Sequence, residues 1–523
     1  MRFFSFDLSS LIRALSWRSS LAVALLAGAV NVLSFAPFHL WPLQILSLSL
    51  LLLIVMRRDD YSWLRIAMLG WCYGFGWMFC GVCWLIILMT RFNDLPLWMS
   101  VIGLGLLASY LALFAAIALA LGRYLQGRWK LAASSTLLLV LPALWVLSEW
   151  LRGWLLTGFP WLVSGYAHST SPLAGYAAVV GVYGVGWISA VIAGAMVLAI
   201  LQRQSRKQMG VLMVALLMAG IALRQHAWTV PHGQAISVRL LQGNVDQSVK
   251  FDMAHVNESL ALYHDMIVAA PADLIVTPET ALPILSSQLP PDYLPGFNAF
   301  AQSTNSSLIA GVVVQDGVNL YANSVLGFGM QYAAQTYRYD KHHLVPFGEF
   351  IPFGFRWFVD MMKIPMGELT GGAKVPQAMH IKDQFVLPNI CYESVFGEEI
   401  AQQLKTQMAT KNGTATILLN TSNLAWYGDS IAIPQHLQIS QMRVLETGRP
   451  MLQVTNTGAT AVINAQGEIV AQLKSLTRDT LSAQVQGMSG ITPYILLGNA
   501  GIVVLALLSL LLAFVLTKNR KNS

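Results

Sequence analysis

The feature that most constrains the fold of this chain is the uneven distribution of its apolar residues. They are concentrated in residues 20–226 and again in 494–516, whereas the stretch between has the mixed composition of a globular domain. Only 11% of the 523 residues are charged, against about 25% in typical soluble proteins. A helix needs about 20 apolar residues to cross the hydrocarbon core of a bilayer. The apolar runs therefore predict a helical part that spans a membrane several times.

The apolar runs divide the chain into three predicted regions. We expect spans at 21–36, 40–56, 66–89, 97–121, 132–151, 174–201, 209–223 and 494–516. The regions are a transmembrane domain of about seven spans over 1–228, a globular domain over 229–490, and a last helix with a basic tail over 491–523. The Arg-rich start and first apolar run could also be a cleaved signal peptide. The spans that follow at once favour an uncleaved first helix.

Basic residues gather in alternate gaps between the apolar runs. These gaps hold Arg2, Arg13 and Arg18, then Arg57, Arg58 and Arg65, then Arg123, Arg128 and Lys130, then Arg203, Arg206 and Lys207, and finally Lys518, Arg520 and Lys521. The intervening gaps hold only Arg91, Arg152 and Arg224. Because cytoplasmic loops carry the excess of Lys and Arg, this pattern predicts cytoplasmic termini and a globular domain on the opposite side of the membrane. The net charge of +7 thus reflects topology, and no nucleic-acid partner is expected.

The apolar runs of the globular stretch are shorter than those of the membrane part and are rich in β-branched residues. These runs are 236–241, 274–277, 308–314, 385–390, 415–419 and 451–455, and helical patterns lie at 253–270 and 434–447. Several runs are apolar almost throughout, as in strands that are covered on both faces. Strands mixed with helices therefore predict an α/β sandwich whose sheets are buried.

Cys391 is the only cysteine outside the apolar segments, since Cys72, Cys80 and Cys83 share one of them. On an oxidising side of the membrane, a lone thiol is either a small buried hydrophobe or is kept for its reactivity. Cys391 follows a strand-like run, as do Glu279 and Lys341. A thiol, a carboxylate and an amine at strand ends are the components of a nucleophile, a base and an oxyanion donor.

The order Glu279, Lys341, Cys391 resembles that of the nitrilase superfamily. Longer strings resemble its membrane-bound branch, the apolipoprotein N-acyltransferases. They are Gln242-Gly-Asn-Val245, His343-Leu-Val-Pro-Phe-Gly-Glu349, Cys391-Tyr-Glu393 and Asn423-Leu-Ala-Trp-Tyr-Gly428, with Glu149-Trp-Leu-Arg-Gly153 and Thr157-Gly-Phe-Pro-Trp161 in the membrane part. The resemblance covers nearly the whole chain, and it implies an αββα sandwich for the globular domain.

The resemblance also implies a reaction. Glu279 would take the thiol proton from Cys391, and the thiolate would attack a phospholipid ester to give a thioester. Lys341 and a backbone N–H just after Cys391 would hold the oxyanion. The α-amine of a diacylglyceryl-modified apolipoprotein would then accept the acyl chain, in a ping-pong mechanism that needs no cofactor. Phospholipid, apolipoprotein and the bilayer are thus the expected partners.

Further residues are assigned by the same resemblance. Glu349 would orient Lys341, and Glu393 and Tyr392 would flank the nucleophile. Trp426 would lie on a loop that meets lipid substrates, whereas Asn323 fits a polar site wall or an ordinary turn equally well. His343 and its neighbour His342 have no third ligand placed with them, so loop hydrogen bonding is favoured over a metal.

Two positions depart from the family pattern, and two other functions compete with acyl transfer. Thr277 stands where the family often has Trp, and Leu424 where Asp is common; both put substrate fit in doubt. A membrane-tethered amidase would use water as the acceptor. A transporter would need ionisable residues inside its spans, and 66–89, 97–121 and 174–201 hold none.

Overall fold

The computed structural model of the chain describes residues 12–58, 60–92, 94–250, 252–357, 368–409 and 413–519. The chain forms two compact units. The helical unit comprises Met1–Thr90, Asp94–His226 and Asn499–Ser523, and the α/β unit comprises Arg91–Asn93 and Ala227–Gly498. Arg2, Arg520 and Lys521, which contribute to the predicted topology, lie outside the described residues.

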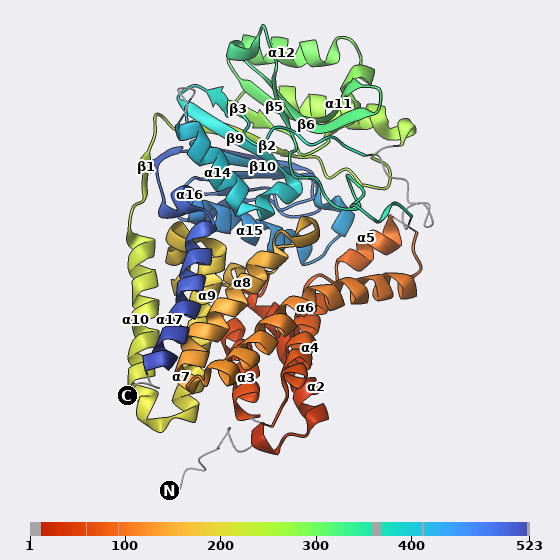
Figure 1. The fold of residues 1–523 in the computed structure, drawn as a ribbon. Helices are drawn as coiled ribbons and strands as arrows, with labels where there is room; N and C mark the ends of the chain where they lie inside the picture. The colour runs from red at the N-terminus through yellow and green to blue at the C-terminus, as the bar shows by residue number, and fades with distance from the viewer. Residues whose placement is uncertain are drawn as a thin grey trace, which may run out of the picture. The chain divides into compact units, whose positions relative to one another are not determined.

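The helical unit is built from long apolar helices (Figure 1). They are α2 (Trp17–Asn31), α3 (Pro42–Arg57), α4 (Trp63–Gly81), α6 (Leu97–Trp129), α8 (Leu141–Arg152), α9 (Ala177–Leu201), α10 (Arg206–Gln225) and α17 (Ala500–Asn519), and the short helix α5 (Leu85–Arg91) follows α4. Within the described ranges, 6 stretches are long and apolar enough to cross a membrane, or up to 7 if the bent pair α4 and α5 counts as one span. The prediction of a multi-span helical part is confirmed.

Three of the predicted spans differ in detail. The span over 66–89 is two helices, because α4 and α5 are bent by 56° at a break after Gly81. The helix α4 ends at Gly81, where a β-carbon would lie 2.2 Å from Cδ1 of Leu162, so a larger residue would make that side chain shift. The span over 40–56 is a helix of only 16 residues. The last helix begins at Ala500 and not at 494, because Gly498, at φ 53°, separates it from a short helix of the α/β unit.

The α/β unit contains two large sheets (Figure 1). The first sheet has the order β14-β2-β3-β5-β6-β7, with β4 paired to β5, and the second has the order β13-β12-β11-β10-β9-β8. The first sheet's strands are β2 (Ile236–Gln242), β3 (Leu274–Val276), β4 (Leu282–Leu285), β5 (Ser307–Gly317), β6 (Leu320–Phe328), β7 (Tyr337–Asp340) and β14 (Asp479–Val485). The second sheet's strands are β8 (Met379–Ile381), β9 (Gln384–Ile390), β10 (Ile417–Ser422), β11 (Met451–Thr455), β12 (Ala461–Ile463) and β13 (Ile469–Gln472).

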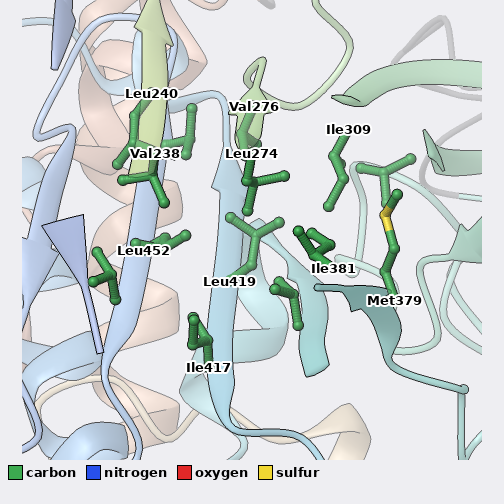
Figure 2. Close-up of a cluster of buried hydrophobic side chains, with 14 of the residues drawn as sticks. Val238, Leu240, Leu274, Val276, Ile309, Met379, Ile381, Ile417, Leu419 and Leu452 are labelled. Atoms are coloured by element: carbon green, nitrogen blue, oxygen red, sulfur yellow. The ribbon is translucent and has the colours of Figure 1, made fainter. Parts of the chain in front are cut away.

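Alternate residues of the strands face two different cores, as the pleat of a β-strand requires. Leu274 and Val276 of β3 and Leu419 of β10 point into the layer between the sheets (Figure 2). Ile275, between them on β3, faces the opposite way, toward α11 (Met253–Val268) and α12 (Tyr293–Ser303). Likewise Leu418 of β10 faces α14 (Gly397–Met408) and α15 (Ala432–Thr447). The layers are therefore helix, sheet, sheet, helix, and the predicted αββα sandwich is confirmed.

The direction of the strands determines where the site is placed. In the first sheet, β3 runs parallel to β5, and β5, β6 and β7 alternate in direction, so β3 and β7 end at the same side. In the second sheet, β9, β10 and β11 are mutually parallel. The carboxyl ends of parallel strands are where α/β sheets carry their ligand-binding loops.

Candidate functional site

The three residues proposed as catalytic each follow the carboxyl end of a strand. Glu279 lies in the turn between β3 and β4, Lys341 directly follows β7, and Cys391 directly follows β9. Glu279 is 7% exposed and Lys341 only 1%. The two sheets thus deliver a carboxylate, an ammonium and a thiol, and the contacts described below bring the three groups together.

Lys341 is shared between two carboxylates. Its Nζ donates to Oε1 of Glu349 at 2.9 Å and to Oε1 of Glu279 at 3.4 Å. Nδ2 of Asn323 donates to the same two oxygen atoms, at 2.8 Å for Glu279 and 2.9 Å for Glu349. Asn323 therefore belongs to this cluster and is not an ordinary turn residue. The second oxygen of Glu349 accepts from the backbone N–H of Val345 at 2.8 Å, which ties the cluster to the 343–349 loop.

The charges in this cluster determine the protonation of Lys341. Burial by itself lowers the pKa of a lysine, but the negative charges of Glu349 and Glu279 outweigh it and raise the pKa of Lys341 above its usual range. A lysine held in this way is a permanent cation at neutral pH. It is thus suited to stabilise an anion and not to act as a base.

The second carboxylate oxygen of Glu279 points toward the other sheet. Its Oε2 accepts from the backbone N–H of Asn423 at 2.8 Å, and Asn423 directly follows β10. The same N–H also interacts with the Cys391 thiol. One oxygen of Glu279 therefore faces the ammonium, and the other faces the nucleophile's surroundings, which is the arrangement that a general base needs.

Cys391 has a left-handed backbone, with φ 53°, which is uncommon for a residue other than glycine. It opens the short 3₁₀ turn Cys391–Val395 that directly follows β9. Burial raises the pKa of its thiol, the negative charge of Glu279 raises it further, and Lys341 only partly opposes this. The thiol is therefore protonated at neutral pH, and a reaction through the thiolate requires a base at the moment of attack.

Glu393 joins the nucleophile's turn to the loop that follows Lys341. Its Oε2 accepts from the phenol of Tyr339 at 2.6 Å and from the backbone N–H of Ile390 at 2.5 Å. Its Oε1 accepts from the N–H groups of His342 at 2.6 Å and His343 at 3.1 Å. With all of these donors directed at one buried side chain, Glu393 holds two loops in register and has no lone pair facing the reacting groups.

Tyr392, His343 and Trp426 lie outside the carboxylate cluster. The His343 ring stacks on Phe396 with centroids 3.5 Å apart and bonds Oε1 of Glu399 at 2.8 Å. Tyr392 packs edge-on against Phe396 at 5.2 Å. These rings form an aromatic wall beside the nucleophile's turn. Trp426 lies on the 3₁₀ turn Leu424–Tyr427 and is half-buried.

One close neighbour of Glu279 is not suggested by any sequence motif. Lys250 is 2% exposed, and its Nζ donates to the backbone carbonyl of Glu279 at 3.2 Å and to Oγ1 of Thr280 at 2.7 Å. Thr280 has φ 48°, so the amine braces a strained turn. Burial lowers the pKa of Lys250 to about 7, although the charge of Glu279 opposes this shift. In the sequence, a buried lysine looks the same as a surface one; only its neighbours distinguish it.

The two departures from the family pattern have clear structural roles. Thr277 is fully buried, and its Oγ1 accepts from the N–H of Gly311 at 3.0 Å, which pins β5 to the turn that carries Glu279. Leu424 is 1% exposed and packs into the core beneath α14 and α15. Thr277 thus acts through the backbone, and Leu424 contributes packing.

Comparison with known proteins shows the family of the chain. A 506-residue stretch is 48% identical to an apolipoprotein N-acyltransferase of Ralstonia nicotianae and covers 94% of this chain and 93% of that protein. The chain belongs to the apolipoprotein N-acyltransferase family. The family member of Nitrosomonas europaea is 40% identical, over 94% of this chain and 96% of its own length.

The match to the family extends over both units. Residues 27–195 match the apolipoprotein N-acyltransferase N-terminal domain, and residues 220–494 match the carbon-nitrogen hydrolase family. Among solved structures, an amidase of Nesterenkonia AN1 from the nitrilase superfamily is 16% identical, with a TM-score of 0.39, covering 52% of this chain and 97% of that chain. As a member of this acyltransferase family, the chain is a multi-span membrane enzyme that transfers acyl groups.

Proposed function

We propose that this protein transfers an acyl chain from a phospholipid to the N-terminal amine of a lipoprotein whose first residue is an S-diacylglyceryl cysteine. The transfer passes through a thioester on Cys391. The observation that carries the proposal is the convergence of Glu279 and Lys341 on the partly buried thiol of Cys391, in a chain whose other unit is a set of apolar helices long enough to cross a membrane.

The first half of the reaction forms the acyl-enzyme. Glu279 takes the proton from Sγ of Cys391 as the sulfur attacks the ester carbonyl carbon of the phospholipid. The carbonyl oxygen becomes an oxyanion, held by the ammonium of Lys341 and by the backbone N–H of Tyr392. The C–O bond then breaks, and the lysophospholipid leaves with the proton that Glu279 returns to its oxygen. The acyl chain remains on sulfur as a thioester.

The second half transfers the acyl chain to nitrogen. The α-amine of the lipoprotein attacks the thioester carbon, Glu279 accepts a proton from the amine, and the C–S bond breaks. The thiolate recovers that proton, so enzyme and base return to their starting state. Splitting an ester-to-amide exchange into two steps lets one nucleophile and one base serve both.

The same proposal includes the arrangement of the chain in the membrane. The transmembrane part is residues 1–228, the catalytic domain 229–490 and the last helix with its tail 491–523. Alternation of the basic gaps supports cytoplasmic termini and a catalytic domain on the periplasmic face of the inner membrane. The donor and the acceptor would then both be anchored in the membrane that holds the enzyme.

Replacement of the nucleophile tests the function. Cys391→Ser should abolish thioester formation and the conversion of diacyl to triacyl lipoprotein, while Cys83→Ser, at an exposed thiol of the helical unit, should keep both. Parental turnover by Cys391→Ser would refute the mechanism. Mass spectrometry of the products separates the rival: acyl transfer gives one lysophospholipid for each N-acylated peptide, whereas a water-using amidase or esterase gives free fatty acid.

A further inference from the structure

The backbone carbonyl of Cys391 accepts hydrogen bonds from three buried side chains. Nδ2 of Asn420 lies 3.1 Å from this oxygen, Oγ of Ser394 lies 3.1 Å from it and Nε2 of His436 lies 3.3 Å from it. Asn420 and Ser394 are fully buried and His436 is 1% exposed. The three come from β10, the nucleophile's own turn and α15. We call Asn420, Ser394 and His436 the carbonyl cradle.

Neighbouring groups fix the donors of the carbonyl cradle in place. Nδ2 of Asn420 also donates to Oδ1 of Asn389 at 2.6 Å, and its own Oδ1 accepts from Ser422 at 2.6 Å. The amide of Asn420 can therefore point only one way. This network adds rigidity to the donor that meets the carbonyl.

The protonation of His436 is fixed in the same way. Nε2 of His436 lies 3.3 Å from the carbonyl oxygen, which can only accept, and 3.1 Å from Oγ of Ser394, which can also accept. The tautomer that serves both contacts has the proton on Nε2 and leaves Nδ1 as the acceptor. The amide nitrogen of Gln453 lies 3.0 Å from Nδ1 and supplies the matching donor. Burial lowers the pKa of His436 to about 4, so the ring is neutral at the pH of the reaction. His436 is thus a fixed N–H donor and not an acid or a base.

The carbonyl that the cradle holds belongs to the peptide bond that carries the N–H of Tyr392. In a trans peptide, C=O and N–H lie in one plane and point in opposite directions. Fixing the carbonyl of Cys391 toward Asn420, Ser394 and His436 therefore fixes the N–H of Tyr392 away from them. Hydrogen bonds to the oxygen also polarise the peptide and strengthen its N–H as a donor.

We propose that His436, Ser394 and Asn420 are positioning residues that orient and polarise the Cys391–Tyr392 peptide so that its N–H stabilises the oxyanion. This inference rests on the proposed function, in which that N–H and Lys341 share the oxyanion. It assigns the cradle to one chemical event, the formation of the tetrahedral intermediate. The cradle should leave the reactivity of the sulfur itself almost unchanged.

Two reactions of Cys391 separate this role from a general effect on folding. Acylation by an ester passes through an oxyanion, whereas alkylation by iodoacetamide displaces iodide at a saturated carbon and forms none. The rates of both are measured on the purified full-length protein, with phospholipid and with a p-nitrophenyl fatty-acyl ester as donors. The variants are His436→Phe, which keeps a ring without the donor, His436→Gln, which restores an N–H donor, and Ser394→Ala.

We expect His436→Phe and Ser394→Ala to slow acylation ~10-fold or more, since loss of a whole oxyanion donor costs about 10²–10³-fold, and to leave alkylation within about 2-fold. His436→Gln should recover most of the acylation rate. Ser440→Ala, at a buried hydroxyl of α15 with no bonded partner within the described residues, should change neither rate.

Two results would overturn the proposal: acylation and alkylation falling together, or acylation unchanged in both His436→Phe and Ser394→Ala. If His436→Phe does not fold, Ser394→Ala, which removes a single oxygen, carries the test. If the parental protein accepts the p-nitrophenyl ester but not phospholipid, the proposed donor is wrong and the cradle is still tested by the ester.

Discussion

At the scale of single residues, the neighbours of Lys341 and Glu279 suit them to different roles: Lys341 to that of a permanent cation and Glu279 to that of the proposed base. Lys341 contacts two carboxylates and stays charged, whereas Glu279 shares its oxygens between Lys341, Asn323 and the Asn423 N–H. The thiol next to them rests in its neutral form, because burial and then the charge of Glu279 raise its pKa. The negative charge that would let Glu279 act as a base therefore also makes the thiol of Cys391 less acidic.

This opposition gives a prediction for Glu279→Gln. Removing the negative charge should lower the pKa of Cys391, so at a fixed pH below that pKa the thiolate fraction rises and iodoacetamide reacts faster. Acyl transfer should nevertheless fall by about 10²–10⁴-fold, because the general base is lost. The two rates, measured on one purified preparation, should move in opposite directions. A parallel fall in both would mean that alkylation, like acyl transfer, needs Glu279 to take the thiol proton, and that this need outweighs the repulsion between carboxylate and thiolate.

Lys250 gives a second prediction at this scale. Lys250→Met keeps the length of the side chain but loses both bonds to the turn of Glu279 and Thr280, so acyl-enzyme formation should slow ~10-fold or more through displacement of the base. A neutral amine still has two N–H donors, so the parental rate should not drop as pH rises through 7. A Lys250→Met enzyme with the parental acylation rate would show that the turn holds without this brace.

The sequence points to the proposed reacting groups more readily than to the residues that support them. Cys391, Glu279 and Lys341 each follow a strand-like run. The types of these residues and their order in the chain indicate a chemistry even without a structure. Lys250 and His436 have no such signal, since a buried lysine or histidine is defined by contacts with residues far along the chain. From the sequence alone, Asn323 fits a turn or a polar site wall equally well. The hydrogen bonds from its amide to Glu279 and Glu349 place it in the cluster.

At the scale of elements, the turn that carries Glu279 is clamped by β5. A β-carbon on Gly311 would lie 2.2 Å from the carbonyl oxygen of Pro278 and 2.8 Å from the N of Thr280. Gly311→Ala should therefore displace the turn, lower the stability by about 1–3 kcal/mol and abolish most acyl transfer. Gly317→Ala on the same strand is the matched control, because its nearest neighbour would be a Leu320 methyl at 3.4 Å.

Thermal unfolding in detergent and the rate of acyl-enzyme formation measure the two effects of this pair of variants. Equal activity of Gly311→Ala and Gly317→Ala would contradict the clamp. The close approach of β5 to the turn after β3 joins residues that are far apart in the sequence. The sequence therefore predicts β3 and β5 as strands but does not predict this contact between β5 and the turn. The break between α4 and α5 is also missed, because the run 66–89 is apolar throughout and gives no sign of the 56° bend between the two helices.

At the scale of the whole molecule, the basic residues in alternate gaps predict the side of the membrane on which the α/β unit lies, and thiol labelling tests this prediction. In a variant with Cys72, Cys80 and Cys83 replaced by alanine and Cys391 by serine, Val318→Cys, at an 88% exposed position of the α/β unit, should react with a membrane-impermeant maleimide added to intact spheroplasts. Lys207→Cys, in a basic gap, should react only after lysis. The reverse pattern would place the catalytic domain in the cytoplasm and contradict the proposed topology.

The central claim is that Cys391 carries an acyl chain from a phospholipid, and the mass of the protein tests it most directly. Purified enzyme incubated with a phospholipid of defined acyl chains and no acceptor should gain the mass of one acyl group on the peptide that contains Cys391. Hydroxylamine should remove it, as expected for a thioester, and a diacylglyceryl-cysteine peptide should take it up as an amide. Unmodified Cys391 with free fatty acid accumulating, or an adduct on another residue, would contradict the account.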